Sequence, residues 1–139
     1  MITVSQYLFI YGTLLAHGNV YAQYLRQHCK LIGSGKFGGK LYDTGKYPAA
    51  ILYVATGGHV YGSIYLMNEV ENLLDMLDEY EGIGTNEPTP HEYIRQLVKI
   101  DAGHETIACW VYIYNWPIIH LQEVPDGKYL DYINQRNNI

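Results

Sequence analysis

Short apolar runs separated by glycine, proline and other turn residues occupy most of the chain and predict a β-rich fold. The Gly57-Gly58 dipeptide predicts a hairpin between the third and fourth strands, and residues 101–104 predict another between the last two. Glycines between residues 33 and 39 predict that the second strand is irregular or bulged. The expected strands are residues 7–10, 31–42, 51–54, 59–67, 91–100 and 105–114.

A helical spacing of apolar residues begins near Glu69 and predicts a helix that ends at Tyr80. Asn68 is the expected N-cap, and Gly82 is the expected C-terminal stop. Two further helices are predicted over residues 19–28 and 127–137. These elements predict an α+β fold, in which a small, mostly antiparallel β-barrel carries flanking helices. The length of 139 residues predicts a single domain over residues 1–139.

Composition narrows the classes of partner. A hydrophobic fraction of 48% argues against disorder, while no apolar run is long enough for a membrane helix, so no membrane partner is expected. The net charge is −5 and the basic residues are scattered, which argues against nucleic acid and favours a small-molecule substrate. Cys29 and Cys109 are predicted to be reduced thiols, and with no basic signal segment the expected location is cytoplasmic. The oligomeric state is unknown from the sequence.

Glu81 is the first candidate for chemistry. Val70, Leu74, Leu77 and Glu81 are spaced four, three and four residues apart, which places Glu81 on the apolar stripe of the predicted helix. Desolvation and the helix C-terminus would both raise the pKa of its carboxyl, as general acid/base catalysis requires. The alternative is that the helix ends earlier and leaves Glu81 solvated. The other acids of this helix are expected to face mostly outward, namely Glu71, Asp75, Asp78 and Glu79.

The loop Tyr11-Gly12-Thr13-Leu14 is the second candidate. It follows an apolar strand, and successive N–H groups in such a glycine turn can form a nest that binds a carboxylate. An ordinary strand-to-helix turn is the alternative. Further along, Tyr112 and Tyr114 alternate with apolar residues, so they face one way, toward a barrel mouth or simply into the strand packing.

Other chemistries have little support in the sequence. The glycines of residues 33–38 match the dinucleotide-binding pattern, but no acid stands about twenty residues on, so a bulged strand is the better interpretation. The six histidines lack the paired spacing of metal ligands, and none of the three serines sits in a nucleophile elbow. No metal and no cofactor is therefore expected.

Four segments in this order resemble the γ-glutamyl cyclotransferase-like superfamily: Leu8–Leu14, Gly45–Ala49, Val60–Gly62 and Leu77–Gly82. The resemblance covers residues 7–115, and the short Y-G-T-L form is most similar to the γ-glutamylamine cyclotransferase and bacterial branches. It implies a small β-barrel with a cavity at one end. It also implies a reaction in which a γ-glutamyl substrate cyclises to 5-oxoproline and releases an amine or amino acid.

The resemblance also assigns site residues. Glu81 matches the family's proton acceptor, and the loop from Tyr11 to Leu14 matches the segment that holds the substrate α-carboxylate. Tyr112 matches a family tyrosine, and Tyr93 stands where related enzymes often have a pocket tyrosine. The leaving group is not defined by the sequence. Two rival functions stay open, a non-catalytic small-ligand-binding module on the same fold and an interaction domain with a tyrosine-rich surface.

Overall fold

The computed structural model describes residues 5–12, 20–45, 47–53, 57–80, 83 and 88–137. Its strands are β1 (Tyr7–Ile10), β2 (Cys29–Asp43), β3 (Pro48–Leu52), β4 (His59–Met67), β5 (Tyr93–Asp101), β6 (Thr106–Tyr114) and β7 (Gln122–Val124). Its helices are α1 (Val20–His28), α2 (Val70–Tyr80) and α3 (Tyr129–Asn137). Each predicted helix and strand is present, and β7 is an addition.

Five strands close into a barrel in the order β2, β4, β1, β6 and β5. The closure is a pairing between β5 and β2, at Lys36 and Asp101. The pairings are antiparallel except that of β1 with β6, which is parallel. The closure confirms the predicted barrel, and it leaves no free edge among these five strands.

The predicted hairpin between residues 51–54 and 59–67 was wrong. β3 begins at Pro48 and pairs with the C-terminal part of β2, whereas β4 pairs with the N-terminal part of β2. β2 has 15 residues and is long enough to serve both partners. The change of partner occurs near Gly39, where an added Cβ would lie 2.3 Å from the backbone oxygen of Ile51. Glycine at this position allows the two backbones to approach.

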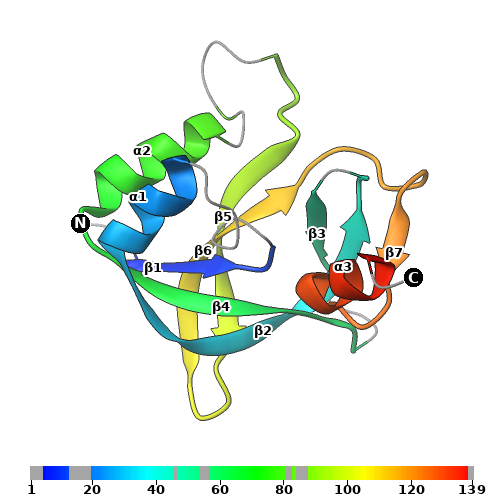
Figure 1. Cartoon of the computed structure of the whole chain (residues 1–139), viewed down its shortest axis with the longest axis horizontal. Coiled ribbons are helices and arrows are strands. Elements are labelled where there is room, and N and C mark those ends of the chain that lie inside the picture. The colour runs from blue at the N-terminus through cyan, green and yellow to red at the C-terminus, as the bar shows by residue number, and fades with distance from the viewer. Residues whose placement is uncertain are drawn as a thin grey trace.

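Helices α1 and α2 lie together against one side of the barrel, and α3 lies on the opposite side near β3 and β7 (Figure 1). The apolar stripe of α2 is confirmed, since Leu73, Leu74 and Leu77 are buried in one cluster with Leu25 of α1. The start of α2 differs from the prediction by one residue. The backbone oxygen of Glu69, rather than that of Asn68, accepts the first helical hydrogen bond, from Leu73.

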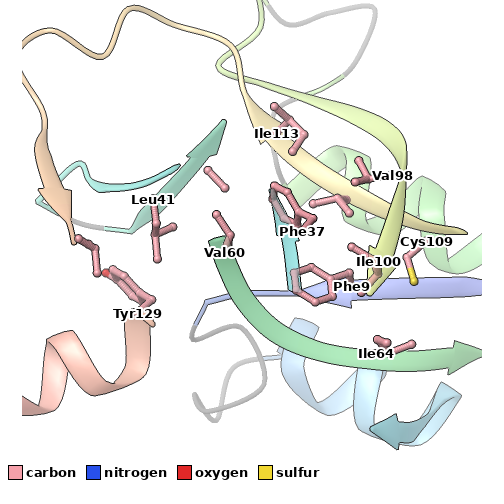
Figure 2. Close-up of a cluster of buried hydrophobic side chains, with 13 residues drawn as sticks. Phe9, Phe37, Leu41, Val60, Ile64, Val98, Ile100, Cys109, Ile113 and Tyr129 are labelled. Atoms are coloured by element: carbon pink, nitrogen blue, oxygen red, sulfur yellow. The ribbon is translucent and has the colours of Figure 1, made fainter. Parts of the chain in front are cut away.

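Side chains from all five barrel strands fill the barrel interior (Figure 2). Phe9 and Phe37 meet edge to face with their ring centres 5.7 Å apart, a favoured geometry for aromatic pairs. The predicted bulge is confirmed, because the register of β2 against β4 shifts between Leu31 and Gly33. Among the described residues, no helix is long and apolar enough to cross a membrane.

Candidate functional site

The candidate residues that the structure describes converge at one end of the barrel. β1 and β6 are parallel, so their C-terminal ends lie at the same end. β5 runs antiparallel to β6 and begins there, with Tyr93 directly opposite Tyr114. The last turn of α2 also reaches this region, because the side chain of Asp78 contacts Tyr112. Four elements distant in sequence therefore meet at this end of the barrel.

Tyr11 and Gly12 form the described part of the predicted cradle loop. The hydroxyl of Tyr11 donates a hydrogen bond to the backbone oxygen of Tyr112, which fixes the end of β1 to β6. Gly12 lies against Pro48, the first residue of β3, and an added Cβ would be 2.6 Å from the Pro48 Cγ. No larger residue fits at position 12 unless the proline ring shifts.

Tyr93 contacts the same proline from the other strand. Its hydroxyl donates to the Pro48 backbone oxygen at 2.6 Å, and its side chain is buried. Its ring also meets Tyr114 edge to face, with the centres 5.4 Å apart. Pro48 is thus held between Gly12 and Tyr93, two residues that the resemblance had singled out independently.

Tyr112 and Tyr114 do share one face of β6, as the alternation predicted. That face packs against α2 and the start of β5, however, and not into the barrel interior, where Val111 and Ile113 point. The Tyr112 hydroxyl donates to Oδ1 of Asp78 at 2.6 Å. The bond joins the strand that carries one candidate residue to the helix that leads to another.

Asp78 corrects the expectation that the acids of α2 other than Glu81 face outward. It accepts two hydrogen bonds from Arg95 of β5, from Nε at 2.9 Å and from Nη2 at 3.1 Å. The guanidinium of Arg95 in turn lies over the ring of Trp110, 4.7 Å from its centre. The spacing of four between Leu74 and Asp78 puts both on the side of the helix that faces the sheet, and this signal was available in the sequence.

Glu81, Thr13 and Leu14 lie outside the described residues. Beyond the last described residue of α2, the Ile83 backbone N–H donates a hydrogen bond to the Asp78 backbone oxygen at 2.8 Å. A bond between residues five apart is typical of the turn that closes a helix C-terminus. Of the predicted site residues, the structure therefore brings together Tyr11, Gly12, Tyr93 and Tyr112.

No group of three or more histidine, cysteine or acidic side chains among the described residues is arranged to hold a metal ion. Cys29 and Cys109 are free, as predicted. Burial raises the pKa of the Cys29 thiol to about 11 and that of Cys109 to about 12. Neither has the low pKa that a nucleophilic thiolate requires.

Comparisons with known proteins identify the family and the fold. Residues 8–131 match the family model for "Gamma-glutamyl cyclotransferase, AIG2-like". The γ-glutamylcyclotransferase family protein YtfP of Shigella flexneri is 29% identical over 126 residues, covering 89% of this chain and 96% of that protein. The solution structure of YtfP from Escherichia coli superposes with a TM-score of 0.64 at 28% identity, over 91% of this chain and 98% of that one. YkqA of Bacillus subtilis shares the fold, with a TM-score of 0.71 at 19% identity, over 96% of this chain and 43% of YkqA.

Proposed function

Because the chain belongs to the γ-glutamyl cyclotransferase, AIG2-like family, we propose that it cyclises a γ-glutamyl amide by intramolecular aminolysis. The α-amine of the substrate attacks its own γ-carbonyl carbon, and a new C–N bond closes a five-membered ring. The original γ-amide C–N bond breaks, and the departing nitrogen takes up a proton. The products are 5-oxoproline and a free amine or amino acid, with no net oxidation.

The observation that carries this proposal is the convergence of Gly12 and Tyr93 on Pro48, next to the hydrogen bond from Tyr11 to the Tyr112 backbone oxygen. In the proposal, the backbone N–H groups of the loop from Tyr11 to Leu14 hold the substrate α-carboxylate, since successive amides in a turn bind anions. Pro48 packs against that loop at Gly12. A substrate anchored there is folded with its amine near its γ-carbonyl, and such orientation is worth up to about 7–11 kcal/mol of the barrier.

Glu81 is the proposed proton carrier. It takes a proton from the α-amine nitrogen as that nitrogen attacks and gives it to the leaving nitrogen, a role that contributes about 10²–10⁴-fold to the rate. Asp78 supports this role as a positioning residue, because it precedes Glu81 by three residues and is held by Arg95 and Tyr112. The chemistry needs no enzyme nucleophile, which agrees with the raised thiol pKa values of both cysteines.

The test is release of 5-oxoproline from a panel of γ-glutamyl amino acids and γ-glutamyl amines. Glu81→Gln is expected to keep its fold and its binding of the substrate but to lose at least about a hundredfold in kcat. Glu79→Gln is the matched control, because Glu79 is an exposed acid of the same helix. Undiminished turnover in Glu81→Gln contradicts the role of Glu81. Binding of the panel without release by the wild type supports the non-catalytic binding module instead.

A further inference from the structure

A carboxylate and four aromatic rings stand beside the candidate cradle and take no part in the proposed proton transfers. The hydroxyl of Tyr47 donates to both carboxylate oxygens of Glu92, at 2.7 and 2.6 Å. The ring of Tyr47 lies 5.9 Å from that of Tyr93, centre to centre. The row continues from Tyr93 to Tyr114 and on to Trp116, at 5.4 and 6.4 Å. Tyr47 and Trp116 are exposed, so the two ends of the row reach solvent.

Several hydrogen bonds outside the cradle hold this group in place. The turn before β3 fixes Tyr47, because its backbone N–H donates to the Thr44 hydroxyl and its backbone oxygen accepts from that hydroxyl. The backbone oxygen of Glu92 accepts from the Asn115 N–H at 2.7 Å. The indole of Trp116 donates to the Pro90 oxygen at 2.9 Å. These hydrogen bonds therefore fix the positions of Tyr47, Glu92 and Trp116.

The group adjoins the cradle directly. Tyr47 is bonded to Pro48, and Pro48 is the residue that contacts Gly12. Tyr93 bridges the two, because its hydroxyl reaches the Pro48 oxygen while its ring contacts Tyr47. A substrate whose γ-glutamyl group is anchored at the loop thus has its other half close to Glu92 and the aromatic row.

The Glu92 carboxylate gives this group of side chains a negative charge. None of the ion pairs that the described residues form includes Glu92. Desolvation, and to a smaller extent the charge of Glu92, raise the pKa of the Tyr114 hydroxyl. A carboxylate beside aromatic faces is the combination that binds alkylammonium groups, through charge pairing and through cation–π contact.

We propose that Tyr47, Glu92, Tyr93, Tyr114 and Trp116 form the leaving-group subsite, and that this subsite selects γ-glutamyl amides whose leaving amine carries a second, positively charged amino group. The inference rests on the proposed function and narrows its substrate class. A diamine joined to glutamate through one nitrogen has the required chemistry. A leaving amino acid brings a carboxylate close to Glu92 and is disfavoured.

The experiment compares γ-glutamyl-1,4-diaminobutane with γ-glutamyl-n-pentylamine, a neutral amide of matched size, and with γ-glutamylvaline, whose leaving group carries a carboxylate. The wild type is expected to prefer the diamine derivative over the neutral amide by about tenfold in kcat/KM, the size given by a partly exposed charge pair beside an aromatic wall. Glu92→Gln is expected to remove that preference, through a fall of about tenfold in kcat/KM for the diamine derivative. Glu123→Gln, an exposed acid of β7, is the matched control and should keep the preference.

Calorimetric binding of the same three amides separates the two proposals. If no amide releases 5-oxoproline but the diamine derivative binds more tightly, and Glu92→Gln abolishes the difference, the proposed function fails and the subsite stands. If all three are turned over at similar kcat/KM, the reaction stands and the subsite is overturned. A preference for the diamine derivative that survives Glu92→Gln also overturns it.

Discussion

Asp78 and Arg95 form a two-point ion pair that ties the last turn of α2 to β5. Both side chains are mostly buried, with 18% of Asp78 and 26% of Arg95 exposed. Tyr112 adds a third hydrogen bond to the same carboxylate. The position of the helix end relative to the barrel is therefore set by charged and polar contacts, in addition to the leucines behind it.

Replacement of Asp78 by asparagine tests this anchor. The change removes the charge that Arg95 pairs with, so the free energy of unfolding should fall by about 1.5–3 kcal/mol, the range for hydrogen bonds to charged groups. In the proposed mechanism it also moves Glu81, and a displacement of about 1 Å costs about a hundredfold in rate. In steady-state kinetics we expect a large fall in kcat and a smaller change in KM. Urea unfolding measures the loss of stability.

Asp75→Asn is the control for that variant, because Asp75 is an exposed acid on the same helix. It should change neither stability nor kcat. A stable Asp78→Asn protein with wild-type kcat would show that the ion pair does not position the catalytic acid.

Gly12→Ala tests the contact between the cradle loop and β3. The added methyl group would lie 2.6 Å from the Pro48 Cγ, so either the loop or the proline ring must move. We expect kcat/KM to fall by about tenfold or more, equal to about 1.4 kcal/mol of lost transition-state binding. Gly33→Ala is the control, because a Cβ at Gly33 meets no atom within 4 Å. Equal losses in both variants would point to a general effect on strands rather than on the cradle.

Local sequence patterns predicted the helices and strands better than they predicted which strands pair. The spacing of Leu73, Leu74 and Leu77 defined α2, and the turn at Gly103 defined the hairpin of β5 and β6. The partner of β3 was predicted wrongly, because strand pairing depends on tertiary contacts and a single long strand, β2, took both candidates. Turn residues alone do not show that two neighbouring strands will each pair with a third strand instead of with each other.

In the candidate site, too, a local motif was predicted and a contact between distant elements was not. Tyr11 and Gly12 were identified from a local motif. In the structure Gly12 lies near Tyr93 through Pro48, and Tyr11 is hydrogen-bonded to the Tyr112 backbone oxygen. Asp78 was missed, because its role depends on Arg95, which stands seventeen residues further along the chain on another element. The spacing from Leu74 indicated the side of the helix on which Asp78 lies, but no local pattern indicated Arg95 as its partner.

Leu73→Ala tests the packing of α2 against the barrel. Leu73 is fully buried, and truncation of such a leucine costs about 2–5 kcal/mol, because apolar contacts are lost and a cavity remains. Chemical unfolding should show a loss of unfolding free energy in that range. The KM of the protein that stays folded should change little. Leu130→Ala on α3 is the control, since Leu130 is about half exposed and should lose less than about 1 kcal/mol. A small loss at Leu73 would mean that α2 contributes little to the stability of the barrel.

Both cysteines predict a fall in stability at alkaline pH. Burial raises the thiol pKa values from 9.0 to about 11 for Cys29 and about 12 for Cys109. The unfolded chain loses these protons first, so their stabilising contribution is complete below about pH 9 and is lost as the pH rises toward 11 and 12. Native protein at pH 8 should also react with iodoacetamide far more slowly than unfolded protein, because the thiolate is the reactive form. Cys29→Ala should reduce the alkaline loss of stability, measured by urea unfolding at pH 8 and pH 10. Rapid labelling of Cys109 in the folded protein would contradict its burial inside the barrel.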